Sequence, residues 1–154
     1  MDCSWIEPGS LAAGSIPFSA DHLRALHHLG IRAILSLTPR PLSVFREITP
    51  ALLAGLDVRC FHVPIPDRQP PSFEQARHIL RLLNQVTLQR RPLFVHGQAG
   101  VGRTGTILCL YFLMRGQSLE QAQAILKARR VQCTLVSDEQ LQFLKEFAGV
   151  AARL

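Results

Sequence analysis

An arginine and four glycines stand within nine residues of one another at positions 97–105, a spacing that could bind an anion. The apolar run at 93–95 predicts a buried strand before them, and the apolar run at 107–114 predicts a helix after them. Glycines let successive N–H groups turn inward, and a helix start adds partial positive charge. The guanidinium of Arg103 would add planar donors that suit phosphate. The sequence therefore predicts a loop that binds a phosphate-like oxyanion, formed by Gly97, Gln98, Ala99, Gly100, Val101, Gly102 and Arg103.

Two nucleotide-binding patterns overlap this loop. Residues 97–104 read G-x-x-x-x-G-R-T, a nucleotide P-loop with arginine in place of lysine, and residues 100–105 read G-x-G-x-x-G, the dinucleotide fingerprint. Both patterns usually open a series of alternating strands and helices. The sequence after the loop shows only helical patterns, so no later strand would supply a metal-binding aspartate or a ribose-binding acid. Nucleotide binding is therefore the weaker alternative, which magnesium-dependent binding of ATP would support.

A third pattern of the loop resembles the protein tyrosine phosphatase superfamily. The string V-H-G-Q-A-G-V-G-R-T-G-T at 95–106 is similar to the V-H-C-x-A-G-x-G-R-T-G-T loop of small, atypical dual-specificity phosphatases. The string W-I-E-P-G-S-L-A-A-G at 5–14 also resembles the start of these enzymes. The resemblance implies one domain over residues 1–154 that hydrolyses phosphomonoesters through a cysteinyl-phosphate, with no cofactor and no metal. The loop departs from the family at Gly97, where the catalytic cysteine is expected.

The resemblance also implies a general acid and a phosphate clamp. The string I-P-D at 65–67 matches the acid loop of small dual-specificity phosphatases, which makes Asp67 the candidate acid. A turn aspartate after proline is the alternative interpretation of this residue. Arg103 would hold the equatorial oxygens of the phosphate, whose charge develops in the transition state.

Three further polar side chains receive roles from the resemblance. His96, directly before the loop, would support it through hydrogen bonds and tune the nucleophile, a role that overlaps with that of a buried, hydrogen-bonded histidine. Thr104 would present a hydroxyl to the nucleophile or the leaving phosphate, unless it is only a residue of the first helical turn. Gln140 would position the hydrolytic water, although it also fits the third position of a capping box.

Gly97 offers no sulfur, hydroxyl or carboxylate, so the chain is expected to turn over very poorly. One explanation is an active phosphatase whose cysteine was replaced to trap a ligand, and the other is a natural pseudophosphatase that binds phosphoproteins without turnover. The remaining catalytic set favours the first explanation. Glycine also removes a thiolate that would repel a phosphate dianion, so we expect binding of phosphate, sulfate, or proteins and peptides with phosphotyrosine and also phosphoserine or phosphothreonine.

The elements that must position these residues are predicted as strands early and helices late. Strands are expected at 31–37, at 57–63 and directly before the loop, with short extended pieces within 5–13. Helices are expected at 19–29, 72–89, 104–114 and 118–130 and from 137 onward, three of them with capping boxes. The segment 42–53 would be helical only in part, limited by Pro50. This order predicts an α/β fold with a short, mostly parallel sheet covered by helices on both faces.

Length and composition fit one globular domain. The chain has 154 residues, 47% of them hydrophobic, and no apolar run long enough for a membrane span. A net charge of +6 favours anionic partners, but no zinc-finger, RNP or basic-zipper pattern supports nucleic acid as a partner. We expect a cytoplasmic monomer without a signal peptide. The four cysteines, Cys3, Cys60, Cys109 and Cys133, are widely spaced, so neither a zinc site nor a disulfide framework is expected. We also expect none of them to replace the missing nucleophile.

Overall fold

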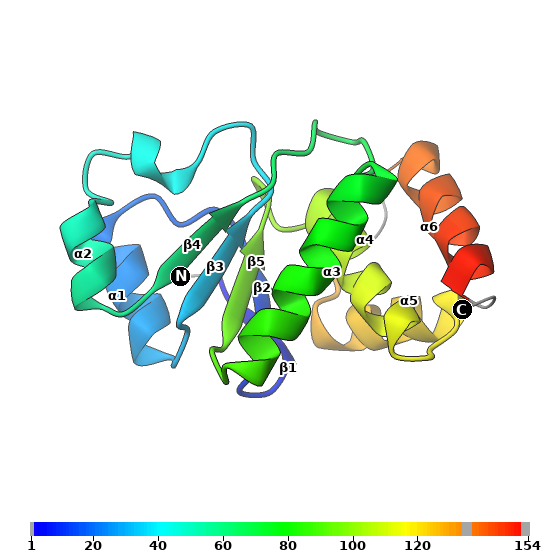
Figure 1. The fold of residues 1–154 in the computed structure, drawn as a ribbon, viewed down its shortest axis with the longest axis horizontal. Helices are drawn as coiled ribbons and strands as arrows, with labels where there is room; N and C mark the ends of the chain where they lie inside the picture. The colour runs from blue at the N-terminus through cyan, green and yellow to red at the C-terminus, as the bar shows by residue number, and fades with distance from the viewer. Residues whose placement is uncertain (1, 134–136, 152–154) are drawn as a thin grey trace.

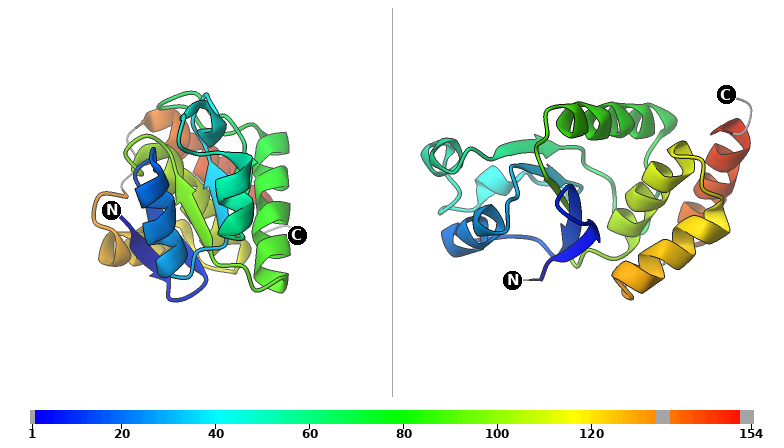
Figure 2. Two further views of the ribbon diagram at one scale, coloured as in Figure 1. Left: turned by 90° about the vertical axis from the view of Figure 1, so that its left-hand side faces the viewer. Right: turned by 90° about the horizontal axis from the view of Figure 1, so that it is seen from below.

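The computed structural model describes residues 2–133 and 137–151. A central sheet separates two groups of helices, with α1 and α2 on one side and α3, α4, α5 and α6 on the other (Figure 1 and Figure 2). The elements in chain order are β1 (Ser4–Glu7), β2 (Leu11–Gly14), α1 (Ala20–His28), β3 (Ala33–Ser36), the short 3-10 helix η1 (Leu42–Val44), α2 (Pro50–Gly55), β4 (Arg59–His62), α3 (Phe73–Leu88), β5 (Leu93–His96), α4 (Gly102–Met114), α5 (Leu119–Arg129) and α6 (Asp138–Ala151).

Within the described residues, five strands form one sheet in the order β1-β2-β5-β3-β4. The central strand β5 runs parallel to both of its neighbours, β2 and β3, and β4 runs parallel to β3. Strand β1 is antiparallel to β2 at the edge of the sheet. The predicted α/β class with a mostly parallel sheet is therefore confirmed. Because the carboxyl ends of parallel strands lie on the same side of the sheet, the segments that follow β2, β3, β4 and β5 all begin there. This side is called the carboxyl edge of the sheet.

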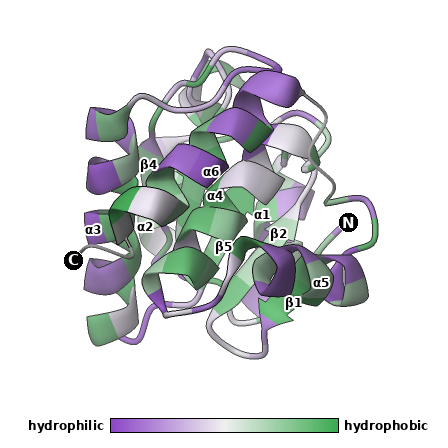
Figure 3. Cartoon of the chain, turned by 90° about the vertical axis from the view of Figure 1, so that its right-hand side faces the viewer, coloured by the Kyte–Doolittle hydropathy of each residue, from purple (hydrophilic) through white to green (hydrophobic). Residues whose placement is uncertain are grey.

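Alternate residues of the central strands supply two separate cores. Val95 and Leu35 join the large core beneath the helices α3 to α6, whereas Phe94 and Ile34 join a smaller core with α1 and α2. Helix α4 is buried along almost its whole length, and Figure 3 shows it mainly in the colour of hydrophobic residues. The loop that follows β5 is thus carried by a buried strand and continued by a buried helix.

Helix boundaries largely follow the predicted caps, with two exceptions. The capping boxes at Ser72 and Ser118 are confirmed, but the one predicted at Ser137 is only half formed, because the Gln140 side chain does not return to the cap. The expectation that Pro50 limits a helix is wrong, because Pro50 opens α2 at its first turn, where the missing N–H costs nothing. Leu29 lies at the end of the predicted helix 19–29, where it is the C-cap and is 46% exposed. None of the described helices is long and apolar enough to cross a membrane.

Candidate anion-binding site

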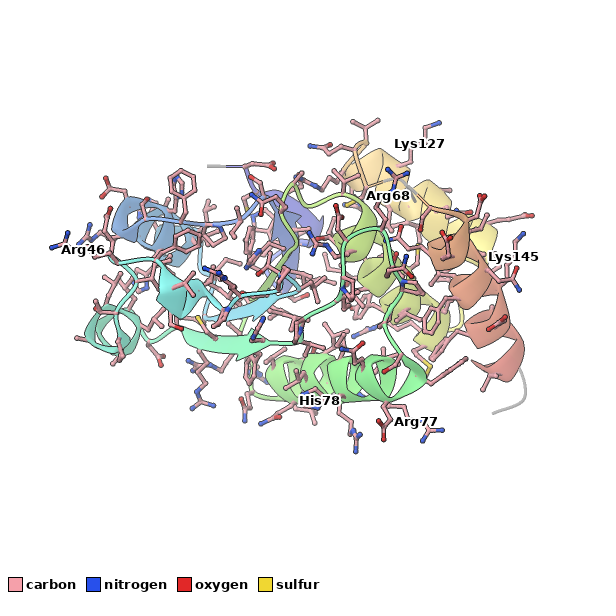
Figure 4. All side chains as sticks on the ribbon, turned by 90° about the horizontal axis from the view of Figure 1, so that it is seen from above. Arg46, Arg68, Arg77, His78, Lys127 and Lys145 are labelled. Atoms are coloured by element: carbon pink, nitrogen blue, oxygen red, sulfur yellow. The ribbon has the colours of Figure 1, made fainter. Side chains whose placement is uncertain are left out.

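A cleft of about 500 Å³ lies at the carboxyl edge of the sheet, between β5 and α4. Its lining consists of Asp67, Arg68 and the whole predicted loop 97–103. The backbone bends at each residue from 97 to 101 instead of continuing the strand. Figure 4 views the molecule from this side and labels Arg68. A cleft of this size is in the range of small-ligand sites, and it is formed by the residues singled out from the sequence.

The carbonyl groups of the loop all face the surrounding protein. Each one from Gly97 to Gly102 accepts a hydrogen bond, and the donors in order are His96 Nδ1 (2.8 Å), Ile16 N (3.0 Å), Arg130 Nη2 (3.2 Å), Arg130 Nε (3.0 Å), Gly105 N (2.7 Å) and Thr106 Oγ1 (2.8 Å). The described peptide bonds are all trans, so each N–H points away from the carbonyl before it. The N–H groups of residues 98–103 therefore face the cleft. In the described part of the chain, none of those at 98–101 donates a hydrogen bond to the protein.

Gly97 stands at the base of this ring of donors. Its own N–H donates to Thr104 Oγ1 at 3.0 Å, so the buried Thr104 hydroxyl lies directly beside the position expected for the nucleophile. A Cβ atom added at Gly97 would lie 3.3 Å from Nε and 3.6 Å from Nη2 of Arg103. These are atoms of a long side chain that can shift by a few tenths of an ångström, so position 97 can accommodate a side chain next to the guanidinium.

Gly100, in contrast, cannot be replaced without moving the backbone. Its φ of +69° lies in the left-handed region, and an added Cβ would collide with the carbonyl of Gly14. Two glycines of the loop thus differ: the turn requires glycine at position 100, whereas position 97 does not require it.

Arg103 and Asp67 meet at the cleft although they are far apart in the sequence. Arg103 is only 7% exposed, and its Nη1 donates to the carbonyl of Ile65 at 3.1 Å. Its Nε lies 3.8 Å from Asp67 Oδ1, and the Asp67 side chain is 81% exposed. The guanidinium thus forms the wall of the cleft, while the carboxylate stands at the rim, where the group attached to a bound phosphate would emerge.

His96 is buried behind the loop in one defined tautomer. Nδ1 carries the proton, because it donates to the carbonyl of Gly97, and Nε2 accepts from the hydroxyl of Ser36 at 2.7 Å. Burial lowers the pKa of His96 from 6.5 to about 4, so the ring is neutral at physiological pH. The sequence interpretation missed Ser36. The parallel register of β3 and β5 places Ser36 directly opposite His96, and the sequence alone did not show this register.

Gln140 lies behind the loop that carries Asp67 and is not among the residues that line the cleft. Its N–H donates to Ser137 Oγ at 3.2 Å, as in the predicted cap, but its fully buried side chain turns elsewhere. There Nε2 donates to the carbonyl of Gln69 at 3.4 Å, while Oε1 is buried without a partner among the described residues. The role predicted for Gln140 with the hydrolytic water stays a prediction.

The sequence interpretation also missed Arg130, and it left open how close Cys133 comes to the loop. Arg130 is 2% exposed and holds two of the loop carbonyls. The Cys133 thiol donates to the carbonyl of Gly100 at 3.5 Å, so it contacts the outside of the loop and not the cleft. Burial raises the pKa of Cys133 to about 11, and the protonated sulfur cannot replace the missing nucleophile.

The donors of the cleft suit an anion. They are backbone N–H groups and a guanidinium, which bind oxygen atoms of a tetrahedral oxyanion without a metal. Within residues 2–133 and 137–151, no three His, Cys, Asp or Glu side chains gather as a possible metal site. The same residues contain no strand after β5 that could supply the acid of a nucleotide site. The geometry therefore favours phosphate recognition over either nucleotide pattern.

The chain belongs to the family of the Swiss Army Knife protein, DSP-PTPase phosphatase domain (PTP-SAK), whose model matches residues 1–152. It is similar in structure to Tk-PTP in its active form, with 25% identity, a TM-score of 0.81, and coverage of 96% of this chain and 97% of that chain. A kinase associated phosphatase with its catalytic site cysteine substituted by serine is 22% identical, with a TM-score of 0.82 and coverage of 100% and 97%. PTPMT1 in complex with PI(5)P is 17% identical, with a TM-score of 0.83 and coverage of 98% and 97%.

The family makes this chain a dual-specificity phosphatase domain, and hence a hydrolase by family. The solved structures share its fold along nearly the whole length of both chains. The loop, the arginine and the aspartate thus lie in a fold that dual-specificity phosphatases share.

Proposed function

We propose that this chain binds phosphorylated side chains in the loop 97–103 and releases phosphate from them very slowly or not at all. The observation that carries this proposal is the outward direction of the loop carbonyls, which leaves the N–H groups of residues 98–103 facing one cleft with Arg103. A phosphomonoester has three nonbridging oxygens that accept several hydrogen bonds each, so it matches a ring of donors closed by a planar guanidinium.

The same geometry supports a part for each residue in the family's reaction. The nonbridging oxygens would be held by the loop and by Arg103, and the bridging oxygen would face Asp67. In an enzyme with cysteine at position 97, the thiolate attacks phosphorus and the bond to the bridging oxygen breaks. The leaving oxygen then takes a proton from the aspartic acid. Gly97 has no atom that can form the bond to phosphorus, so the reaction would stop at the bound ester.

The missing cysteine should help binding. A thiolate at the base of the cleft would repel the phosphate dianion, and glycine removes this charge while the donors remain. We therefore infer that the chain acts as a trap for phosphorylated proteins, first of all those with phosphotyrosine and also those with phosphoserine or phosphothreonine. The loop itself carries no lysine, since Gln98 and Val101 are uncharged, and we rank phosphoinositides below phosphoproteins as ligands.

Two accounts of Gly97 make different predictions for the variant Gly97→Cys. If the domain is a phosphatase that has lost only its nucleophile, the variant regains activity. If it is a natural pseudophosphatase adapted to binding alone, the variant stays inert although it is folded. The space beside Gly97 supports the first account, because the nearest neighbour of an added Cβ is Nε of Arg103 at 3.3 Å, in a long side chain that can shift by a few tenths of an ångström.

The test is the hydrolysis of an aryl phosphate by the chain and by its Gly97→Cys variant, measured across pH. We expect no release of phosphate above background from the chain itself and clear turnover by the variant. Adding Asp67→Ala to the variant should lower kcat by about 10²–10⁴-fold, because the leaving group loses its proton donor. An inert but folded variant would overturn the first account. If the unaltered chain did not bind phosphotyrosine, the proposal as a whole would be overturned.

A further inference from the structure

Arg130 uses all of its side-chain donors next to the anion loop. It caps the end of α5 and is almost fully buried. Nε donates to the carbonyl of Gly100 at 3.0 Å, and Nη2 donates to the carbonyl of Ala99 at 3.2 Å. The remaining N–H groups bond Asp2, with Nη1 and Nη2 each 2.7 Å from a carboxylate oxygen, and Ser4 Oγ at 3.0 Å. A guanidinium has five N–H donors, and here each one has its own acceptor.

Asp2 and Arg130 form an ion-pair bridge, and Asp2 connects this bridge to the end of strand β2, which lies beside β5. Besides the two contacts to Arg130, its Oδ2 accepts from the N–H of Ser15 at 3.1 Å. A Cβ added at Gly14 would collide with the carbonyl of Asp2, and one added at Gly100 would collide with the carbonyl of Gly14. The backbones are therefore packed without room for a side chain between them. The loop cannot move outward at Gly100 unless this whole assembly moves.

The bridge acts on the donors that face the ligand. The carbonyl of Ala99 and the N–H of Gly100 belong to one peptide plane, and the carbonyl of Gly100 and the N–H of Val101 belong to the next. Holding the two carbonyls from outside thus fixes the directions of two N–H groups inside the cleft. Hydrogen bonding to Arg130 keeps the pKa of the Asp2 carboxyl below its ordinary value of 3.8, so the bridge is ionised at neutral pH.

We propose that Arg130, oriented by Asp2, is a positioning residue that sets the shape of the anion loop and thereby its affinity for phosphate. The choice of phosphate as the ligand rests on the proposed function, whereas the contacts between Arg130 and the loop do not. A lysine at position 130 would keep the positive charge but would lose the planar fork that reaches two carbonyls and a carboxylate at once. Charge and geometry can therefore be separated by conservative variants.

The first measurement is the affinity of the chain for phosphotyrosine, by calorimetry, before and after Arg130→Lys. We expect the affinity to fall about tenfold to a hundredfold, the loss that follows when one hydrogen bond to a charged group is lost. The matched control is Arg91→Lys. Arg91 forms an ion pair of 2.8 Å with Asp57, and these two residues lie just before the starts of β5 and β4, at the opposite end of the strands from the cleft. This control should leave the affinity unchanged. Equal affinity in the Arg130→Lys variant would overturn the proposal.

Asp2→Asn is a second variant, for which a pure charge effect and a positioning effect predict opposite changes in the affinity for phosphotyrosine. Removal of a negative charge near the loop would, by electrostatics alone, strengthen the binding of an anion. Loss of the carboxylate that orients Arg130 should weaken it. Weaker binding supports the proposal, and equal or tighter binding overturns it. If Arg130→Lys does not fold, this variant carries the test by itself.

A third measurement separates this proposal from the proposed function. In the background of Gly97→Cys, the pKa of the introduced thiol is measured from the pH dependence of its alkylation. The inward N–H groups stabilise the thiolate, so Arg130→Lys should raise this pKa although no charge has changed. This result reports on loop shape even if no phosphorylated ligand binds. An unchanged thiol pKa, with only a loss of thermal stability, would reduce Arg130 to a merely structural residue.

Discussion

The neutral state of His96 follows from its position between two hydrogen-bond partners of opposite kind. The carbonyl of Gly97 requires a proton on Nδ1, and the hydroxyl of Ser36 then donates to Nε2. A second proton would sit on a fully buried ring, next to the charge of Arg103, and this is why the pKa falls to about 4. The ring thus serves as a fixed support for the first peptide of the loop.

The burial of His96 predicts that the free energy of unfolding depends on pH through this one residue. The unfolded chain takes up a proton at His96 near pH 6.5 and the folded chain only near pH 4, so stability is lost as pH falls between these values. The shift corresponds to about 3 kcal/mol of unfolding free energy. Urea unfolding at several pH values should show this loss in the chain and a smaller one in the variant His96→Gln. Identical pH profiles for both would contradict the burial of a neutral His96 ring.

Helix α6 is joined to the loop that carries Asp67 through one buried amide, that of Gln140. Gln140, in the first turn of α6, donates to the carbonyl of Gln69, two residues after Asp67. The contact is long, at 3.4 Å, and the amide oxygen has no partner in the described part of the chain. Two roles are therefore compatible with its position: a support for the acid loop, or a ligand for the water of the second chemical step.

Kinetics of Gln140→Leu in the Gly97→Cys background distinguish these roles. If Gln140 supports the acid loop, the loss in kcat/KM should be largest for substrates with poor leaving groups, which need the proton of Asp67 most. If it positions water, a burst of leaving group should appear, because the cysteinyl-phosphate accumulates. Gln142→Leu, an exposed residue of the same helix, is the control. An effect no larger than that of the control would remove Gln140 from both roles.

At the scale of the whole molecule, a positively charged chain presents its cleft at the edge where the parallel strands end. The net charge is +6, and Arg68 stands at the cleft beside Asp67. Arg77 carries the same charge on the outer side of α3, away from Arg68 in Figure 4. Charges attract an anionic ligand over a distance of about 10 Å at 0.1 M salt, so the position of each arginine should matter.

We therefore expect salt to weaken phosphopeptide binding mainly through the association rate. Arg68→Gln should slow association several-fold at low salt and much less at high salt, because screening removes the same attraction. Arg77→Gln changes the net charge equally and should have a smaller effect at every salt concentration. Stopped-flow association rates for the chain and both variants provide the measurement. Equal losses in the two variants would mean that net charge alone, and not the cleft, guides the ligand.

Local patterns were sufficient to predict the strand, the loop and the helix that form the cleft. The spacing of glycines and the apolar runs act over a few residues, and the capping boxes at Ser72 and Ser118 do so as well. Ser36 and Arg130 were missed because their partners lie 60 and up to 128 positions away in the sequence. Pro50 was misjudged because proline disrupts the interior of a helix but opens its first turn, and the sequence alone did not locate that turn.

Phosphate binding by the loop is tested most directly by a titration of the isotopically labelled chain with phosphotyrosine, followed by the amide resonances of residues 97–105. Binding in the loop predicts that the amides of 98–103 shift along one saturable curve without magnesium, and that Arg103→Ala abolishes this curve. Loop amides that stay unchanged, or that respond only to ATP with magnesium, would contradict it.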